Sequence, residues 1–398
     1  MRVGVITKEW PPHIYGGAGV HVQYLVESLR SEIDVAVHCF GEARTDAKNY
    51  ELSTELSVLN PAFQTIMTDM DIARNLNGVD LVHSHTWYAN LAGHLAKQMY
   101  GIPHVITAHS LEPDRPWKAE QLGGGYQISS WLERISYESA DAIIAVSQGM
   151  KRDILRAYPS LNPSKIFPIL NGIDTNKYTP TFNENVLTER EISGRYALFV
   201  GRITRQKGLA HLLRAWKIAN PDIGLVIAAG SPDEPGIGQE IAALIKELQT
   251  DRSNIWWFEK MLPQSELITL LTHADFFICP SIYEPLGIVN LEAMACETAV
   301  LASDVGGIPE VVIDHETGEL VHYPSAPYRD ATSRDDEFEA ALASKIRHFS
   351  QHPELLEKYG KAGRRRAMTE FSWQTIASQT ITLYSDLISQ SKRKNIRE

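Results

Sequence analysis

The chain has 398 residues and a formal net charge of −11, with 43% hydrophobic and 22% charged residues. This composition is typical of a folded globular protein, and the length favours two domains over a single core. The negative charge argues against a nucleic-acid partner, so any anionic ligand must be attracted by local groups.

The cysteines and the apolar runs favour a cytoplasmic location. Cys39, Cys279 and Cys296 show no metal-ligand spacing and lie in or beside apolar runs, so we expect buried free thiols in a reducing compartment. The apolar run near Met1 is too short for a signal peptide. No apolar stretch approaches the ~20 residues of a membrane span, so we expect no membrane partner.

The first half of the chain alternates between short apolar runs and amphipathic stretches. The apolar runs predict strands and the amphipathic stretches predict helices, and continuous apolar strands alternating with helices indicate a parallel sheet covered on both faces. The predicted strands are 3–7, 34–40, 79–85, 103–109 and 141–146, and the predicted helices are 21–30, 87–100 and 131–140.

The second half repeats this pattern. Its predicted strands are 196–203, 223–230, 254–260, 275–281 and 298–304, and its predicted helices are 209–219, 238–249, 265–274 and 285–295. We therefore expect an α/β protein with two facing Rossmann-like, doubly wound domains and a ligand cleft between them. The predicted domains are 1–175 and 176–371, followed by a C-terminal helix, 372–398, that crosses back to the first domain.

A glycine-rich loop follows the first predicted strand. Gly16, Gly17 and Gly19 precede a helix, where backbone N–H groups can bind an anion and glycine lets a ligand approach closely. The loop lacks the third glycine of the dinucleotide fingerprint and the lysine of a Walker loop. Glycines needed only for a turn explain the same residues.

Two basic residues lie at the C-terminal end of the first strand of the second half. Arg202 and Lys207 lie five positions apart in "VGRITRQKGL", where both could reach one diphosphate. Surface charges without a function are the alternative. In "EPLG" we expect Pro285 at the first helical position, so that the N–H groups of Leu286, Gly287 and Ile288 face a negative charge.

Glu284 and Glu292 flank the helix predicted at 285–295, and they could form an acid/base pair, a metal site or a grip on neutral hydroxyls. With Glu284 in the loop and Glu292 two turns into the helix, they would lie ~10–12 Å apart. Glycosidase carboxyls lie ~5–10 Å apart across one bond. This spacing favours two contacts along a long ligand.

We predict no metal site. Asp69 and Asp71 are expected to open a helix, where acids suit the dipole. His83 and His85 alternate at a strand end, so that one should face inward and one the cleft, and no third ligand has a matching spacing. His85 and Trp87 are interpreted as cleft wall that could stack on an acceptor sugar, with core packing as the alternative.

Taken together, "GRITRQKG" and the E-x7-E pattern of "EPLGIVNLE" resemble the retaining glycosyltransferases of family 4, which have the GT-B fold. "TKEWPPHIYGGAGVHV" and "TAHSLEPDRPWKAEQLGGGYQISSW" are similar to the actinobacterial glycogen-synthase-like branch, which includes α-maltose-1-phosphate synthases. The resemblance covers essentially the whole chain. It implies transfer of glucose from ADP-glucose, a nucleotide sugar, with retention at the anomeric carbon and no further cofactor.

The resemblance also assigns roles to residues of both halves. Arg202 and Lys207 match the basic pair on the donor diphosphate, Glu284 the glutamate on the sugar hydroxyls, and Glu292 the glutamate on the ribose. Gly17 matches a loop glycine near the distal phosphate, and His109 an active-site histidine beside the transferred sugar, although a structural histidine explains that position too.

We place the acceptor on the first domain. The residues expected there are His85, Glu112, Arg115, Lys118 and Tyr126. A basic cluster beside a glycine run would suit glucose 1-phosphate, and the end of an α-1,4-glucan is the other acceptor considered. Exposed loop charge explains the same residues.

One residue departs from the pattern of another group of synthases. Ile14 stands where glycogen synthases of the other large bacterial group carry a loop lysine, so no role of that lysine can be transferred. The alternatives are a family-4 enzyme with another donor or acceptor, a sugar-nucleotide epimerase, or a non-catalytic sensor. An oxidoreductase with Glu42 as its ribose-binding acid would need the missing glycine. A homodimer is compatible with the sequence.

Overall fold

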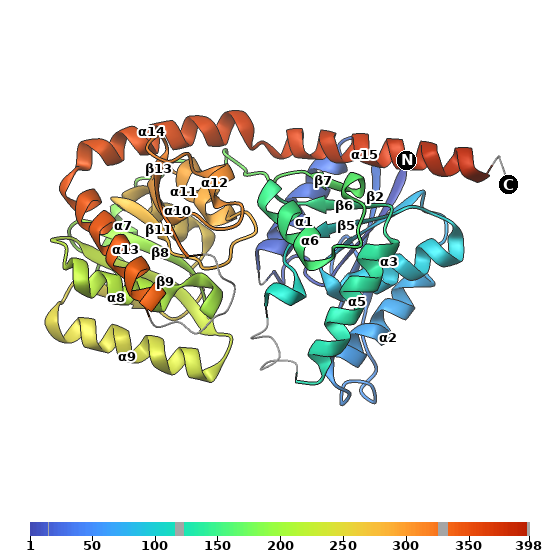
Figure 1. Ribbon diagram of the computed structural model, residues 1–398, viewed down its shortest axis with the longest axis horizontal. Helices are drawn as coiled ribbons and strands as arrows, with labels where there is room; N and C mark the ends of the chain where they lie inside the picture. The colour runs from blue at the N-terminus through green and yellow to red at the C-terminus, as the bar shows by residue number, and fades with distance from the viewer. Residues whose placement is uncertain (15, 116–122, 325–332, 396–398) are drawn as a thin grey trace. The chain divides into compact units, whose positions relative to one another are not determined.

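The computed structural model describes residues 1–14, 16–115, 123–324 and 333–395, and it divides the chain into two compact units. The first unit comprises Met1–Gly172 and Trp373–Glu398, and the second comprises Ile173–Ser372 (Figure 1). Within the described residues, no helix is both long and apolar enough to cross a membrane.

The first unit is built on a parallel sheet whose strands follow the order β3-β2-β1-β4-β5-β6-β7. Its strands are β1 (Arg2–Thr7), β2 (Asp34–Phe40), β3 (Lys48–Tyr50), β4 (Leu81–His85), β5 (His104–Ala108), β6 (Ala142–Ala145) and β7 (Ile166–Pro168). Its helices are α1 (Gly17–Leu29), α2 (Pro61–Ala73), α3 (Trp87–Tyr100), α5 (Gly125–Ser139), α6 (Gln148–Ala157) and α15 (Trp373–Asn395), with short 3₁₀ turns η1 (Glu112–Asp114) and η2 (Pro163–Lys165).

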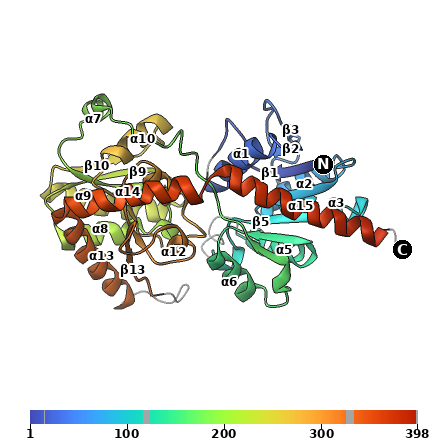
Figure 2. The same cartoon turned by 90° about the horizontal axis from the view of Figure 1, so that it is seen from above.

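Alternation along β1 divides the core of the first unit between the two faces of the sheet. Val3 and Val5 pack with α1 and α15, whereas Ile6 packs with α2 and α3. Successive strand residues point to opposite faces, and this produces the division. The C-terminal helix α15 runs along the first unit (Figure 2). It belongs to this core, since its residues Trp373 and Tyr384 are buried there.

The second unit repeats the architecture with the strand order β10-β9-β8-β11-β12-β13. Its strands are β8 (Tyr196–Ile203), β9 (Gly224–Pro232), β10 (Ile255–Phe258), β11 (Phe276–Cys279), β12 (Ala299–Ser303) and β13 (Gly318–Val321). Its helices are α7 (Glu184–Glu189), α8 (Leu209–Ala219), α9 (Pro235–Asp251), α10 (Gln264–His273), α11 (Ile288–Ala295), α12 (Ile308–Val311), α13 (Ser333–Gln351) and α14 (Pro353–Glu370), with the 3₁₀ turn η3 (Arg205–Lys207).

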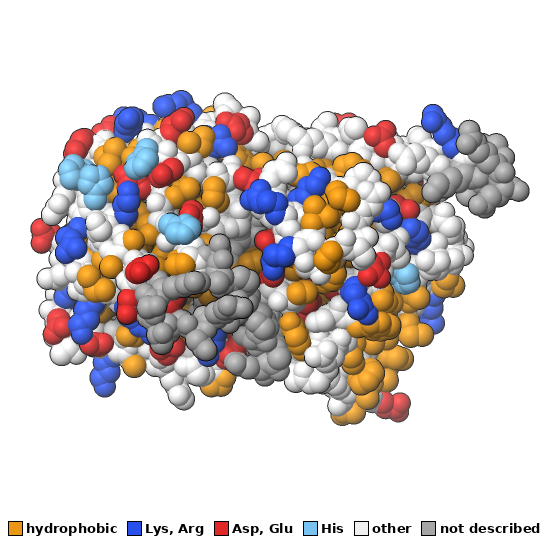
Figure 3. Space-filling model, viewed as in Figure 1, with side chains coloured by type: hydrophobic (Ala, Val, Ile, Leu, Met, Phe, Trp, Pro, Cys, Tyr) orange, Lys and Arg blue, Asp and Glu red, His pale blue; other side chains and the backbone are white. Residues whose placement is uncertain are grey.

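Both sheets have the strand order of a Rossmann fold, in which the order reverses beside the first strand. The doubly wound α/β class predicted from the sequence is therefore confirmed in each unit. In the view of Figure 3, basic and acidic side chains are interspersed over the surface rather than separated into patches of one sign.

Two local predictions are wrong. The helix predicted at 285–295 begins at Ile288, because Gly287 adopts a left-handed φ of 92° and acts as its N-cap. Pro285 therefore lies in the preceding loop. Asp69 and Asp71 lie near the C-terminal end of α2 rather than opening a helix, because this helix begins at Pro61 and has Asn60 as its N-cap.

Candidate functional site

Three of the predicted site residues lie at or after the ends of strands that flank the point in each sheet where the strand order reverses. In the first unit this point lies between β1 and β4, and in the second it lies between β8 and β11. Open α/β sheets bind ligands at such points, outside the carboxyl ends of the strands. His85 ends β4, whereas Lys207 and Glu284 lie in the segments that follow β8 and β11.

In the second unit, Lys207 and Glu284 form an ion pair in which Glu284 is buried and Lys207 is partly buried. Lys207 Nζ donates to Glu284 Oε2 at 2.6 Å, and Ser281 Oγ donates to the same oxygen at 3.1 Å. Burial alone would lower the pKa of Lys207, but the Glu284 carboxylate outweighs burial and raises it. Lys207 is therefore a fixed cation, and Glu284 is a fixed acceptor at the end of β11.

Arg202 is held by a carboxylate as well. Its Nη1 donates to the two oxygens of Asp233 at 3.2 and 3.0 Å, and the Arg202 side chain is 30% exposed. Asp233 follows β9, the strand beside β8. Asp233 was not predicted from the sequence. The signal that could have identified it is an acidic residue directly after a predicted strand.

Glu292 lies inside the fold rather than at its surface. Its side chain is 8% exposed, and Tyr178 donates to Oε1 at 2.8 Å. Gln264 donates in turn to the Tyr178 hydroxyl at 2.7 Å. Burial raises the pKa of Glu292 from 4.5 to about 7. Because α11 begins at Ile288, Glu292 lies little more than one turn into the helix instead of the two turns expected.

The loop before α11 packs closely against the turn that contains Gly306 and Gly307. Gly306 has a φ of 58°, and a Cβ there would lie 1.9 Å from the backbone oxygen of Glu284. Gly307 N–H donates to that oxygen at 3.0 Å. Of the three predicted N–H donors, Leu286 is buried, Gly287 is the N-cap, and Ile288 is the first helical residue. The N–H groups of Gly287 and Ile288 therefore belong to the N-terminus of α11, whereas Leu286 lies one residue before it.

In the first unit, three histidines come together. One ring nitrogen each from His21, His85 and His109 lies within 4.8 Å of the other two. His85 Nδ1 and His109 Nε2 are 3.0 Å apart, and His21 Nδ1 is 2.7 Å from Asn171 Oδ1. Burial lowers the pKa of His21 to about 4 and holds the pKa values of His85 and His109 well below 6.5.

Sequence reasoning missed His21 and Asn171. His21 lies on the buried face of α1 two positions after Gly19, and a polar residue among apolar neighbours was the only signal. One of the two strand histidines was expected to face a cleft, and both are buried in the structure. His83 bonds Tyr384 at 2.5 Å and Thr107 at 2.7 Å, so it joins α15 to the sheet.

The glycine loop before α1 contains a carboxylate of the chain itself. Gly16 is the N-cap of α1, and its N–H donates to Glu9 Oε2 at 2.8 Å. A Cβ on Gly19 would lie 2.5 Å from the same oxygen. Gly17, expected near a phosphate, is the exposed first residue of the helix. Glu9 thus lies where an incoming anion would approach.

The residues predicted on the acceptor side are mostly engaged within the fold. Glu112 is 1% exposed and accepts from Ser129 at 2.6 Å, while the Tyr126 hydroxyl donates to the Glu112 backbone oxygen at 2.7 Å. Arg115 Nη1 donates to Ser110 Oγ at 3.2 Å. Lys118 lies outside the described residues. A structural role therefore explains Glu112, and the acceptor contact remains a prediction.

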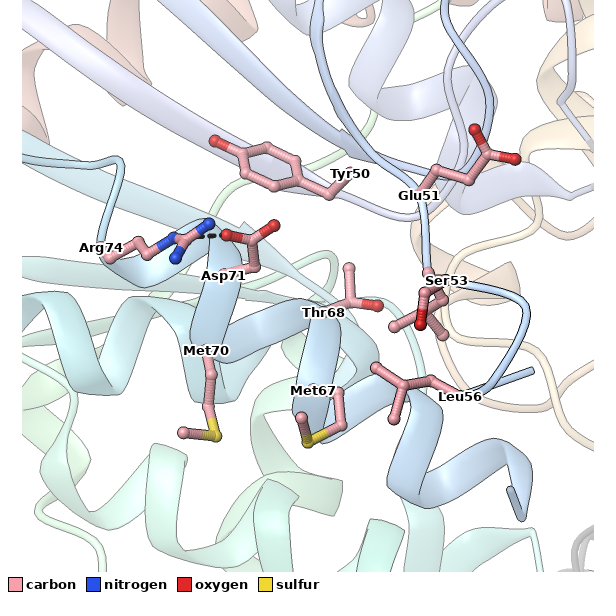
Figure 4. Close-up of a pocket in the computed structure, with 10 residues that line it drawn as sticks. Tyr50, Glu51, Ser53, Leu56, Met67, Thr68, Met70, Asp71 and Arg74 are labelled. Carbon is pink, nitrogen blue, oxygen red and sulfur yellow. Dashed lines mark ion pairs between the residues drawn. The ribbon is translucent and has the colours of Figure 1, made fainter. Parts of the chain in front are cut away.

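A surface hollow of about 350 Å³ lies beside the last turns of α2, away from the residues above (Figure 4). Its lining includes Tyr50, Glu51, Leu56, Met67 and the ion pair between Asp71 and Arg74. It contains no residue predicted to act on a ligand.

Two family models match the chain. The model described as Glycosyltransferase Family 4 matches residues 15–177, and the one described as Glycosyl transferases group 1 matches residues 188–366. The chain is 50% identical to the alpha-maltose-1-phosphate synthase of Mycolicibacterium smegmatis, over 96% of this chain and 99% of that protein. It is 28% identical to a glycogen synthase of Mycobacterium tuberculosis, over 96% and 94% respectively.

Solved structures share the fold. Sucrose-phosphate synthase from Thermosynechococcus elongatus matches with a TM-score of 0.79 at 24% identity, over 98% of this chain and 99% of that one. The catalytic domain of starch synthase IV from Arabidopsis thaliana, bound to ADP and acarbose, matches with a TM-score of 0.70 at 18% identity, over 98% and 99%. The predicted GT-B class is confirmed.

Proposed function

The chain belongs to the family 4 glycosyltransferases, and from this premise we propose that it transfers glucose from ADP-glucose to glucose 1-phosphate with retention, giving α-maltose 1-phosphate. The observation that carries the proposal is 50% identity, over 99% of its length, to a protein named for that product. Lys207 and Glu284, two of the donor contacts proposed below, follow the strands β8 and β11 that flank the strand-order reversal point of the second sheet.

The second unit supplies the donor contacts of this proposal. Lys207 and Arg202 bind the diphosphate and stabilise the charge that develops as the nucleoside diphosphate leaves. Fixed cations suit this task because they need no reorganisation during the reaction. Glu284 accepts from the hydroxyls of the transferred glucose, and Glu292 from the ribose. The N–H of Ile288, at the start of α11, adds a partial positive charge.

The first unit supplies the groups nearest the acceptor. His109 bonds a hydroxyl of the transferred glucose, with its pKa lowered by burial so that the ring is neutral near pH 7. A neutral imidazole can both donate and accept a hydrogen bond, and this suits a hydroxyl. Gly17, at the N-terminus of α1, contacts the distal phosphate once the Glu9 carboxylate has left the Gly16 N–H. Arg115 and Lys118 attract the phosphate of glucose 1-phosphate.

An α-1,4-glucan end is the second candidate acceptor. It is favoured by the 28% identity to a glycogen synthase and by the fold shared with starch synthase IV. Ile14 argues against equating the chain with the lysine-bearing synthases. The higher identity to the maltose-1-phosphate synthase places glucose 1-phosphate first.

The test is incubation with radiolabelled ADP-glucose and either glucose 1-phosphate or glycogen. Label in a phosphorylated disaccharide supports the first acceptor, and label in precipitated polymer supports the second. Label in neither, with a protein that retains its folded circular dichroism spectrum, refutes both. Replacing ADP-glucose with UDP-glucose in the same assay tests the base preference.

Two further predictions concern the whole protein. We propose a cytoplasmic location, since a nucleotide-sugar donor and the three buried free thiols both suit that compartment. Fractionation of the source cells would test it. A homodimer stays a prediction, and size-exclusion chromatography with light scattering would decide between one and two copies.

A further inference from the structure

We propose that His21, His85 and His109 bind a divalent transition-metal ion of the zinc class within the first unit. One ring nitrogen from each lies within 4.8 Å of the other two. The residues come from α1, the end of β4 and the position after β5, so the sheet itself brings them together. Imidazole nitrogen is a common ligand for zinc, copper and nickel.

The protonation of His21 is fixed by its neighbour. Asn171 Oδ1 can only accept, so the contact of 2.7 Å places the ring proton on His21 Nδ1. In the neutral ring, Nε2 then carries a lone pair. Among the described residues this buried Nε2 has no hydrogen-bond partner. A second residue that holds the opposite ring N–H is the usual arrangement around a metal-bound histidine.

His85 supplies a second nitrogen without a partner. Its Nδ1 contacts His109 Nε2 at 3.0 Å, while its buried Nε2 finds no partner in the part of the chain that is described. A buried nitrogen without a partner has a cost of about 1–3 kcal/mol. The cluster contains two such nitrogens, and an ion bound there would pair one or both of them.

His83 shows what a purely structural histidine looks like in the same sheet. Both of its ring nitrogens are bonded, one to Tyr384 at 2.5 Å and the other to Thr107 at 2.7 Å. His83 therefore needs no ligand. His21 and His85 differ from His83 because each has a buried ring nitrogen without a partner among the described residues, which a metal ion could bind.

The electrostatic state of the cluster suits a metal ligand. Burial lowers the pKa of His21 to about 4 and lowers the pKa values of His85 and His109 as well. Neutral imidazole is the form that coordinates a metal, so near pH 7 no proton has to leave. His109 is only partly buried and gives an ion access to the other two rings.

The distances between the three ring nitrogens must shorten somewhat before the nitrogens can bind one zinc ion. Zinc–nitrogen bonds of ~2.0–2.1 Å in tetrahedral geometry place ligand nitrogens about 3.4 Å apart. The separations of up to 4.8 Å must therefore shorten by as much as ~1.4 Å, shared among three rings that can rotate about their side-chain bonds. Three histidines leave the fourth position of the ion open.

The ion would compete with the transferred sugar. This consequence rests on the proposed function, because it assumes that His109 bonds a hydroxyl of the glucose. Zinc bound to His109 would occupy the ring nitrogen that bonds the glucose hydroxyl, and it would therefore inhibit transfer. We therefore expect inhibition that rising ADP-glucose overcomes and that a chelator reverses.

Binding is tested without reference to activity. The full chain is freed of metal with a chelator and titrated with Co²⁺, whose tetrahedral complexes absorb strongly in the visible range. We expect one bound equivalent per chain with a tetrahedral spectrum, displaced by Zn²⁺. His21→Gln should abolish the spectrum. Asn171→Ala should weaken binding by ~10–100-fold, the usual effect of losing the partner of a metal-bound histidine.

The matched control is a histidine pair in the second unit. The rings of His348 and His352 are 4.3 Å apart, and they could bind metal adventitiously. His348→Gln should leave the Co²⁺ spectrum unchanged. An octahedral spectrum, unsaturable uptake by wild type, or equal loss in His348→Gln and His21→Gln would each overturn the proposal. Thermal melts of each variant distinguish the loss of the metal site from the loss of the fold. The Co²⁺ spectrum of the wild-type protein tests the proposal without any substitution.

Discussion

Replacing Glu292 with glutamine should stabilise the second unit in mild alkali and leave its stability unchanged in mild acid. Burial raises the pKa of Glu292 from 4.5 to about 7, so the folded unit holds a proton that the unfolded chain has released between these two values. Stability contributed by this proton is lost as pH rises through that window. Above it, the full cost of a buried carboxylate is present.

The size of the effect follows from the shift. A pKa raised by about 2.5 units corresponds to about 3 kcal/mol, at ~1.4 kcal/mol per unit. Glutamine is neutral at every pH in question and avoids this cost. Its side-chain oxygen can still accept from the Tyr178 hydroxyl, which donates to Glu292 at 2.8 Å. The variant therefore removes the charge and retains the contact.

Differential scanning calorimetry at about pH 4 and about pH 8 measures the difference. For a folded unit of about 150–250 residues, 3 kcal/mol corresponds to ~6–12 °C in Tm, an increase expected only at the higher pH. The control is Glu259→Gln, because Glu259 is exposed in the same unit. The same gain at both pH values, or none at the higher one, would refute the reasoning.

Three further substitutions test the site and the fold. Lys207→Gln keeps a hydrogen-bond donor but removes the charge, and it should lower kcat by ~10²–10³ in the transfer assay. The control is Lys217→Gln, which alters an exposed ion pair and should leave kcat unchanged. An equal loss in both variants would contradict the role of Lys207 in binding the diphosphate. Gly306→Ala places a Cβ 1.9 Å from a backbone oxygen at a φ of 58°, so it should lower Tm markedly, whereas Gly236→Ala, with open space around it, should not. Tyr384→Phe removes a hydroxyl bonded to a buried strand histidine, and it should cost the first unit about 1–3 kcal/mol in denaturant unfolding; an unchanged midpoint would show that this bond does not hold α15.

The regular elements were predictable because their signal is local. The predicted helix at 87–100 and the predicted strand at 196–203 have the observed bounds of α3 and β8. A continuous apolar run between turn residues predicts a buried strand without tertiary information. The start of α11 was not predictable in this way, because Gly287 adopts its left-handed conformation against Asn290 and Ile308, which lie near it in space.

The partners of the site residues were beyond the sequence for a related reason. Arg202 and Lys207 could be identified as a basic pair after a strand, but Asp233 and Glu284 reach them from other strands of the sheet. The histidine cluster combines residues 21, 85 and 109, which share no spacing rule. Metal-ligand spacing detects sites built on one turn or one loop, so a cluster assembled from one helix and the ends of two strands gives no such signal.

The contacts of Glu284 and Glu292 also narrow the interpretation of this pair of carboxylates. Glu284 accepts from both Lys207 and Ser281, so its oxygen is already engaged as an acceptor. Glu292 is buried beneath Tyr178, with its pKa raised to about 7. A glycosidase pair needs two carboxyls that face one scissile bond. Here the Glu284 carboxylate belongs to an ion pair in the segment after β11. The Glu292 carboxylate, on α11, accepts from Tyr178, which in turn accepts from Gln264. Two separate contacts along an extended ligand agree with both environments.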